Sequence, residues 1–150
     1  MLDSHINLSV KRLSDKAVIP KYATAGSAGM DLHACLDQPL TIAPLERVKV
    51  PTGLAIALPG PGYAAFLFPR SGLGVKSGVT LPNCVGVIDS DYRGEVIVGL
   101  VNLSDAPYTV QPGDRIAQMV ILPVTQANIH VVDQLDETSR GAGGFGSTGK

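Results

Sequence analysis

Residues 84–102 read CVGVIDSDYRGEVIVGLVN, two apolar runs on either side of an acidic turn that contains glycine. The runs, Cys84–Ile88 and Glu95–Asn102, are rich in β-branched residues, and neither sustains an apolar repeat of 3.6 residues. Asp, Ser and Gly between two such runs are typical of a turn that joins neighbouring strands. This stretch therefore predicts β-structure.

The same pattern continues along most of the chain. Seventeen glycines and eleven prolines are many for a helical protein and natural for short strands joined by turns. One short helix is expected at Ser71–Lys76, and the rest predicts an all-β sandwich or jelly roll. The other expected strands are Ile6–Leu13, Met30–Cys35, Arg47–Val50, Leu54–Leu58, Tyr63–Phe68, Ile116–Pro123 and Ile129–Val132.

Length and composition restrict the class of protein. A chain of 150 residues is expected to form one domain, and a net charge of −1 gives no general attraction to nucleic acid or anionic membranes. The first 13 residues lack the apolar core of a signal peptide, and four prolines in residues 51–69 exclude a membrane helix. We expect a cytoplasmic protein with Cys35 and Cys84 as buried free thiols.

Two of the expected strands, at residues 96–103 and 116–123, are apolar on both faces. One face of an antiparallel sheet usually meets water. Strands that are apolar on both faces in so small a chain therefore hint at burial between subunits.

Three turns carry candidate ligands for a phosphorylated compound. Asp31 enters an apolar strand, and taken alone it fits a turn-capping carboxylate better than a ligand. Arg70 and Ser71, in PRSGLG, offer a cation, a hydroxyl and glycine-freed amides that suit a phosphate. Gln118 interrupts the apolar run 116–120 and needs a hydrogen-bond partner if it is buried.

The acidic turn after Ile88 holds the strongest candidate for acid–base chemistry. Asp89 would stand at the edge of a dry pocket, where a carboxylate can accept a proton from water. The alternative is an Asp-rich hairpin turn. We keep that interpretation for Asp91 and Arg93, expected as a turn cap and its ion-pair partner.

The last eleven residues, 140–150, read RGAGGFGSTGK, with five glycines around one phenylalanine. Glycine loses much conformational freedom on ordering, so a fixed free conformation is not expected. A polyanion could order it, since Arg140, Ser147 and Thr148 supply charge-assisted hydrogen bonds and Phe145 a ring for stacking. A solubilising tail is the alternative. We expect residues 1–138 to form a barrel domain and residues 139–150 a flexible arm that closes over the active site.

Five segments in this order, AGMDLHA, PRSGLG, NCVGVIDSDYRGEV, GDRIAQM and RGAGGFGSTG, make the chain resemble the trimeric dUTP diphosphatase (dUTPase) family over essentially its whole length. The resemblance implies a jelly-roll-like distorted β-barrel with a glycine-rich arm. It implies hydrolysis of dUTP to dUMP and pyrophosphate with Mg²⁺, which limits uracil in DNA and supplies dUMP for thymidylate synthesis. It also implies a homotrimer whose active sites are shared between subunits.

The resemblance also implies roles for individual residues. Asp89 would activate the attacking water and hold the sugar 3′-hydroxyl, while Tyr92 packs on the sugar and excludes ribose. Asp31 would contact Mg²⁺ through water, as suits an ion that keeps its waters and binds substrate phosphates. The implied substrate-binding positions are Arg70, Ser71, Gly72 and Gln118 around the phosphates, Asn83 and Val87 at the uracil, and Arg140, Phe145, Gly146, Ser147 and Thr148 in the arm.

Two other functions stay open from the sequence. A dCTP deaminase-like enzyme shares the fold family, although the zinc-deaminase pattern H-x-E with P-C-x-x-C is missing. A non-catalytic nucleotide-binding regulator is the second.

Overall fold

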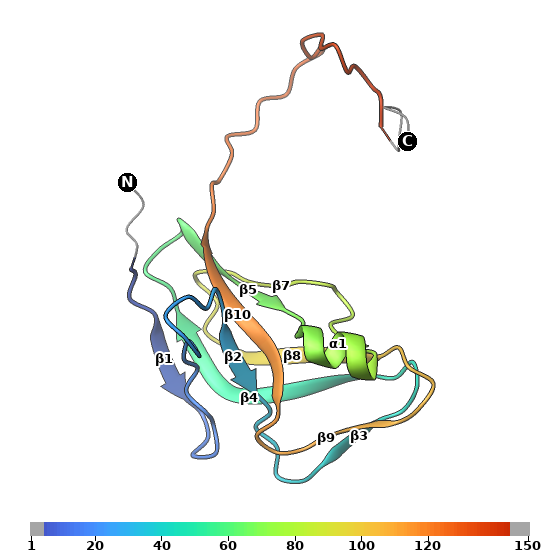
Figure 1. Cartoon of the computed structure of the whole chain (residues 1–150). Helices are drawn as coiled ribbons and strands as arrows, with labels where there is room; N and C mark the ends of the chain where they lie inside the picture. Colours follow the sequence, from blue (N-terminus) through green and yellow to red (C-terminus); the bar gives the residue numbers. More distant parts are fainter. Residues whose placement is uncertain (1–4, 145–150) are drawn as a thin grey trace.

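A computed structural model describes residues 5–144 (Figure 1). Over this range the chain is built almost entirely of strands, with one short helix. The strands are β1 (Ser9–Arg12), β2 (Met30–His33), β3 (Leu40–Ile42), β4 (Arg47–Ala57), β5 (Tyr63–Phe68), β6 (Val79–Thr80), β7 (Gly86–Ile88), β8 (Glu95–Asn102), β9 (Tyr108–Val110) and β10 (Arg115–Pro123), and the helix is α1 (Ser71–Ser77).

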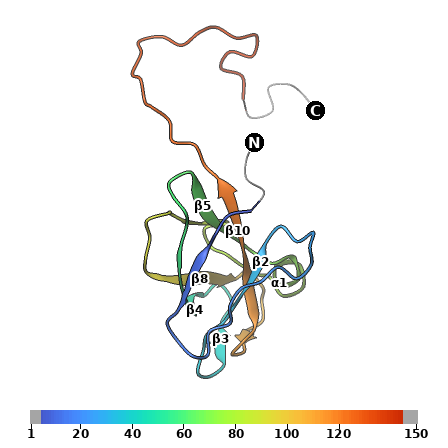
Figure 2. The same cartoon turned by 90° about the vertical axis from the view of Figure 1, so that its left-hand side faces the viewer.

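The strands form two main sheets and a small third one, seen from two sides in Figures 1 and 2. One sheet has the order β1-β4-β8-β6, the second β2-β10-β5-β7, and β3 pairs with β9. Every paired strand is antiparallel, and most neighbours are far apart in sequence. The expected all-β, jelly-roll-like fold is confirmed.

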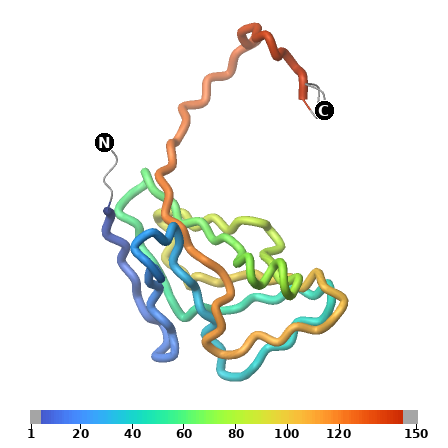
Figure 3. The backbone as a smooth tube through the Cα atoms, in the orientation of Figure 1, coloured from blue at the N-terminus to red at the C-terminus, as the bar shows by residue number. Residues whose placement is uncertain are grey.

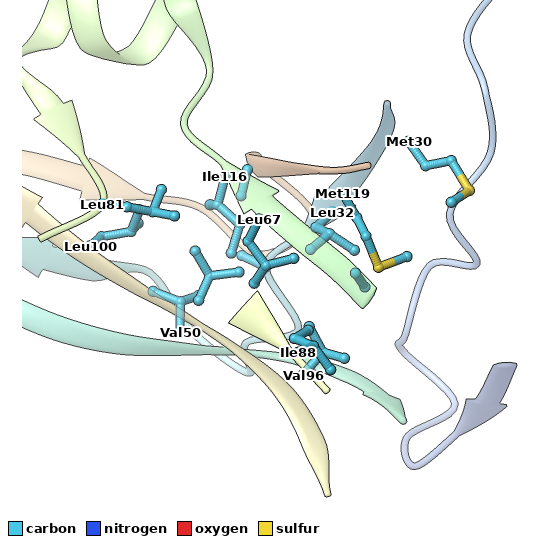
Figure 4. Close-up of a cluster of buried hydrophobic side chains, with 14 of the residues drawn as sticks. Met30, Leu32, Val50, Leu67, Leu81, Ile88, Val96, Leu100, Ile116 and Met119 are labelled. Atoms are coloured by element: carbon cyan, nitrogen blue, oxygen red, sulfur yellow. The ribbon is translucent and has the colours of Figure 1, made fainter. Parts of the chain in front are cut away.

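The core lies between the two four-stranded sheets, where side chains from both meet (Figure 4). In β8, Val96, Val98 and Leu100 are at most 1% exposed, whereas Ile97 between them is 44% exposed. This period of two places one face of the strand in the core. Each fully buried Leu, Ile or Val side chain contributes about 1.5–3 kcal/mol relative to an exposed one.

Strand β10 is central to the second sheet because it pairs with β2 on one edge and β5 on the other. A register shift between Arg115 and Ala117 bends its start. Beyond that bulge, Gln118 lies opposite Asp31 of β2 and Phe68 of β5. The register therefore aligns three segments that are distant in sequence.

Several elements differ from the sequence-based expectation. The two strands expected at Arg47–Val50 and Leu54–Leu58 are one strand, β4, with a register shift between Pro51 and Ala55. Strands β3, β6 and β9 were not predicted, because two or three residues carry too little pattern to stand out. The helix begins at Ser71 as expected and ends at Ser77. The residue after it, Gly78, has left-handed backbone angles, and its N–H donates to the Gly74 carbonyl.

The strand expected at Ile129–Val132 is wrong for this structure. After β10 the chain leaves the body and runs without further strands through residues 124–144, with a local turn at 138–143 (Figure 3). Ile129 and Val131 are 89% and 95% exposed. An apolar segment becomes a strand only when its backbone groups find a partner, and this segment has none within the described chain.

The expectation of two buried thiols is also wrong. Cys35 is half-buried and Cys84 is exposed, and both are free. Cys84 lies in a turn with φ +62°, so its side chain does not continue the apolar strand expected at Cys84–Ile88. No helix within residues 5–144 is long and apolar enough to cross a bilayer. The cytoplasmic location stays a prediction.

The bend of β4 at its register shift depends on the absence of a side chain at Gly53. Its φ is +68°, and a methyl group there would lie 2.8 Å from Cys35 Sγ and 2.9 Å from Ala17 Cβ. Its N–H donates to Glu95 Oε1 at 2.7 Å, which ties β4 to the start of β8. The bend is therefore fixed by backbone conformation, packing and a charge-assisted hydrogen bond together.

We predict that Gly53→Ala lowers the thermal unfolding midpoint by about 5–10 °C. Left-handed strain and overpacking each cost roughly 1–3 kcal/mol, and 1 kcal/mol moves the midpoint of a chain this size by about 2–4 °C. Calorimetry or circular dichroism measures the shift. The control is Gly60→Ala, where a methyl group meets nothing within 4 Å. Equal midpoints for the two variants would contradict this account of β4.

Candidate active site

A cluster of one carboxylate and two guanidinium groups forms where β2, β5 and β10 meet. Asp31 Oδ1 lies 3.3 Å from Arg70 Nε, and Asp31 Oδ2 lies 3.2 Å from Arg115 Nη1. Arg70 also donates from Nη1 to the Arg115 carbonyl at 3.1 Å. We call these three residues the Asp31 cluster. Two cations around one anion leave a net positive charge that suits a phosphorylated ligand.

Gln118 lies beside this cluster, and the nitrogen end of its amide is held by the backbone. Its Nε2 donates to the Pro69 carbonyl at 3.1 Å, so the half-buried side chain has the partner that the sequence required. A methyl group at Gly29 would lie 3.1 Å from Gln118 Oε1. The glycine therefore leaves room for the amide, and Gln118 keeps a second N–H that can donate to a ligand.

Ser71 and Gly72 follow Arg70 directly and are exposed at the start of α1. Arg70 itself has extended backbone angles and is the residue before the helix. Its side chain is only 24% exposed because it folds back onto Asp31. The expected phosphate-binding residues Arg70, Ser71, Gly72 and Gln118 are thus neighbours in the structure, next to Asp31.

His33 lies two residues after Asp31 on the same strand. Its Nδ1 is buried and has no hydrogen-bond partner within the described chain. Burial lowers the pKa of His33 below its ordinary value; Asp31 opposes this shift, whereas Arg115 and Arg70 add to it. The imidazole therefore favours its neutral form and does not add a third cation to the cluster.

Asp89 and Tyr92 line a cavity of about 220 Å³ at the end of β7. The Asp89 carbonyl accepts the Tyr92 N–H at 3.2 Å, which closes the acidic turn. The Tyr92 hydroxyl donates to the Glu95 carbonyl at 3.0 Å, so the ring is held over the turn. Asp89 is exposed in this chain. The dry pocket expected around it therefore requires a further covering surface.

Gly94 allows Tyr92 to take this position. A methyl group on Gly94 would lie 2.4 Å from the Tyr92 hydroxyl oxygen and 2.6 Å from Cζ. Real Cβ atoms do not approach so closely. The ring can therefore cross the turn only because position 94 has no side chain.

Asn83 precedes a strained turn at Cys84. The Val85 N–H donates to the Asn83 carbonyl at 2.7 Å, and Cys84 between them has φ +62°. A hydrogen bond from residue i+2 to residue i across a positive φ describes the rarer form of γ-turn. Such strain in a non-glycine residue is concentrated at functional sites. The turn leaves Asn83 exposed, and Val87 on β7 is 60% exposed.

The expected ion pair between Asp91 and Arg93 is wrong. Arg93 Nη1 instead donates to two carbonyls, those of Ser90 at 2.8 Å and Tyr92 at 3.0 Å. Backbone carbonyls lie closer to the guanidinium than the exposed Asp91 carboxylate does. Arg93 still stabilises the acidic turn, but through side-chain hydrogen bonds to the backbone carbonyls of the turn.

The two groups of candidate residues do not meet within one chain. In the sheet β2-β10-β5-β7, Gln118 pairs with both Asp31 and Phe68, so these two residues lie on one line across the strands. On β7, Ile88 pairs with Ala65 of β5, so Asp89, the next residue, lies about four residues along the strand from that line. Strands are about 4.8 Å apart and residues about 3.3 Å along a strand, so three strand spacings and four residues separate Asp31 from Asp89 by roughly 19 Å. The Asp31 cluster and Asp89 therefore lie at different places on the surface.

The expected arm contributes only one described site residue. Arg140 is exposed, and its Nε donates to the Gly143 carbonyl at 3.0 Å within a local turn. Phe145, Gly146, Ser147 and Thr148 lie outside the described residues.

Two residues of the site were not assigned from the sequence. Arg115 follows the Pro-Gly turn of GDRIAQM, and its contact with Asp31 joins positions 84 residues apart. Gly94 looked like an ordinary turn glycine. For both, the only available signal was membership of a recurring motif, because their roles come from side chains that tertiary folding places beside them.

The donor set around Asp31 suits an ion held mainly by waters and ligand phosphates. Within residues 5–144 no group of three or more His, Cys, Asp or Glu side chains could enclose a metal. Both Asp31 oxygens already face arginines, and the side chain is 25% exposed. A magnesium ion that keeps its waters and contacts Asp31 through one of them fits this arrangement.

Together, the fold and the site define a small all-β protein with a cationic cluster around Asp31 and a separate carboxylate–tyrosine depression. A family model described as dUTPase matches residues 15–149. The chain belongs to the dUTPase family.

Similar proteins agree with this assignment. The deoxyuridine 5′-triphosphate nucleotidohydrolase of Hahella chejuensis is 57% identical over 139 residues, which cover 93% of this chain and 91% of that protein. The protein of the same name from Idiomarina loihiensis is 52% identical over 150 residues, 100% of this chain and 99% of that protein. The structure of the Staphylococcus bacteriophage 80alpha dUTPase with dUPNHPP has a TM-score of 0.87 and 27% identity, covering 96% of this chain and 99% of that chain.

We predict that the pKa of His33 reports the charge of Asp31. The folded-state pKa lies below that of the unfolded chain, so the stability that the neutral imidazole provides is present above about pH 6.5 and is lost as the pH falls through the folded pKa. Asp31→Asn removes the negative charge that raises this pKa and should lower it further. An NMR titration of the His33 ring protons measures both values. An unchanged or higher pKa in the variant would contradict the geometry of the cluster.

Proposed function

We propose that this protein hydrolyses dUTP to dUMP and pyrophosphate. The observation that carries the proposal is the dUTPase family match over residues 15–149, with Asp31, Arg70, Asp89 and Gln118 all present in it. Relatives 52% and 57% identical over nearly their full length are named deoxyuridine 5′-triphosphate nucleotidohydrolase. The enzyme is thus a dUTP diphosphatase.

The chemistry is attack of water on the α-phosphorus. The Asp89 carboxylate accepts a proton from the water as its oxygen bonds to the phosphorus, and the bond from that phosphorus to the bridging oxygen breaks. The dUMP and pyrophosphate products separate, and pyrophosphate carries away the electron pair of the broken bond. No covalent nucleophile is needed, because an oriented water and neutralised phosphates suffice.

The residues of the Asp31 cluster and Gln118 act on the phosphates. Arg70 and the second Gln118 N–H donate to phosphate oxygens, helped by Ser71 and the Gly72 backbone. Such charge-assisted hydrogen bonds are short and about twice as strong as neutral ones. Asp31 holds Arg70 and Arg115 in place before the substrate arrives, so less ordering is needed on binding.

Mg²⁺ is the metal we assign to the reaction. Bound to the triphosphate, it would neutralise part of the charge that develops on the phosphate oxygens. Asp31 would hold it through water, and the other ligands would be substrate oxygens and waters.

We further propose that the enzyme is a homotrimer with active sites shared between subunits. A base must lie within a hydrogen bond or one water of the proton it takes, and the roughly 19 Å between Asp31 and Asp89 is too long for that. Asp89 of one subunit would serve the phosphate-binding residues of another. Exposed apolar residues support a large interface: Ile97 is 44% exposed and Leu103 60%.

The extended segment after β10 fits the same arrangement. Its apolar residues, with Leu135 84% exposed, are costly to leave in water and suit burial against a second copy. Residues 139–150 would then lie over a neighbouring subunit's site, with Arg140 on the terminal phosphate and Phe145 over the uracil. This arm would order on dUTP and loosen to release product.

The base and sugar are recognised at the other group of residues. Asn83 and the backbone near Val87 would read the uracil edge. The Tyr92 ring, fixed by its hydrogen bond to the Glu95 carbonyl, would leave no space for a 2′-hydroxyl.

The test of the function is a pyrophosphate-release assay with dUTP, dCTP, dTTP and UTP at equal concentration. We expect kcat/KM for dUTP to exceed that for each of the others by at least about 100-fold. A site with no space for an additional group discriminates against the larger substrate by about this factor. Ammonia release from dCTP would show a deaminase instead. Absence of any turnover would favour the non-catalytic regulator.

Asp89→Asn should lower kcat by about 10²–10⁴-fold, because the amide cannot accept the proton of water. The nucleotide should still bind, since the side chain keeps its size and hydrogen-bonding capacity. Single-turnover kinetics and a titration with a non-hydrolysable dUTP analogue separate the two effects. Asp91→Asn, in the same turn, is the matched control and should keep near-normal kcat. A normal rate for Asp89→Asn would remove this residue from the role of base.

Mixed assemblies should test the shared site directly. Arg70→Ala and Asp89→Asn each disable every site in a pure assembly. In assemblies refolded from equal amounts of both, about a quarter of the sites should combine an intact Arg70 with an intact Asp89 from another subunit. Activity should therefore return to about a quarter of the normal value. A mixture no more active than its parents would show that one chain supplies both residues.

A further inference from the structure

A second cavity, of about 290 Å³, opens beside the Asp31 cluster. It lies between α1, β9 and the start of β10, and its wall includes Arg70 and Arg115. The other polar residues of the wall are Lys76, Ser77, Tyr108 and Asp114. Asp31, Ser71 and Gln118 do not line it. The cavity therefore shares its two arginines and Gly72 with the residues proposed to act on the substrate phosphates, and its other polar residues are not among them.

The charges of this cavity favour an anion. Three cations, Arg70, Lys76 and Arg115, face it together with one carboxylate, Asp114. That carboxylate already accepts the Gln111 N–H at 2.7 Å, which closes the turn before β10. The Lys76 ammonium is exposed, and within the described chain the structure records neither an ion pair nor a hydrogen bond for it.

The cavity also holds hydrogen-bond donors in excess. The Lys76 ammonium carries three N–H groups, and each arginine uses only part of its five for Asp31 and the backbone. Burial raises the pKa of Tyr108, Asp114 adds to the effect and Arg70 opposes it, so the phenol stays a donor near neutral pH. A compact ligand with several anionic oxygens matches such a wall, and a neutral or cationic one does not.

We propose that this cavity is a binding site for inorganic pyrophosphate, with Lys76, Ser77 and Tyr108 as its ligands beside the two arginines. The proposal rests on the proposed function for the origin of the pyrophosphate, which the reaction releases next to Arg70. By moving off the substrate position while keeping contact with Arg70, the product leaves the phosphate-binding residues free. The site thereby sets how strongly pyrophosphate inhibits the enzyme.

Lys76 could instead serve α1 alone. It lies in the last turn of the helix, where a cation stabilises the exposed carbonyl groups. That role affects stability and leaves pyrophosphate binding unchanged. Ligand affinity, and not the unfolding midpoint, is therefore the measurement that distinguishes the two roles.

The experiment is a calorimetric titration of inorganic pyrophosphate into the full-length protein and three variants. Lys76→Met should weaken binding about tenfold, as expected for loss of one charge-assisted contact. Lys76→Arg should stay within about twofold of the unchanged protein because it keeps the charge. Tyr108→Phe, which removes only the hydroxyl, should weaken binding about threefold.

Two controls make the result specific. Lys49→Met removes an exposed lysine of β4, outside the cavity, and should not change the affinity for pyrophosphate. Titration with dUMP should give the same affinity in all variants. Normal pyrophosphate affinity in Lys76→Met, or an equal loss in Lys49→Met, would overturn the proposal.

Failure of this proposal and failure of the proposed function give different results. The titration requires no turnover. Pyrophosphate binding through Lys76 without hydrolysis of dUTP would therefore contradict only the proposed function. Hydrolysis of dUTP together with unchanged pyrophosphate affinity in Lys76→Met would contradict only the pyrophosphate site.

Discussion

The hydrogen-bonded register of β10 is the constraint on which the site depends. Because the strand pairs with β2 and β5 at once, Gln118 must face Asp31 on one side and Phe68 on the other. Phe68 leads directly to Arg70, so the guanidinium reaches Asp31. A slip of one residue would turn Gln118 and its neighbours to the opposite face of the sheet. Core packing of Ile116 and Met119 prevents that slip.

Strands that carry enough apolar residues could be predicted from sequence, whereas β3, β6 and β9 could not. Tyr63–Phe68 and Glu95–Asn102 have the expected bounds, because each carries enough apolar residues to show its pattern alone. Strands β6 and β9 exist because a neighbouring strand offers backbone groups, which local sequence does not encode. Ile129–Val132 shows the reverse, a strand-like pattern without a neighbour in this chain.

Site residues divide in the same way. Asp31, Arg70 and Gln118 were predicted from motifs, and the structure brings them together as neighbours. That Asp89 lies far from them was not visible in residue patterns, because spacing along the chain says nothing about distance across a sheet. Arg115 and Lys76 gain their significance only from what folding places beside them. The roles of these residues in binding and catalysis stay predictions.

The close approach of Tyr92 to Gly94 limits how this protein can change over generations. A side chain at position 94 is incompatible with the observed place of the aromatic ring at position 92, so replacement of the glycine depends on the residue at position 92. Any lineage that replaces the glycine must first reduce the ring. In the proposed function, that step would remove the packing against the sugar and admit ribonucleotides. The proposed selectivity for deoxyribose therefore ties the two positions together, because a lineage that keeps the ring at position 92 must also keep the glycine at position 94.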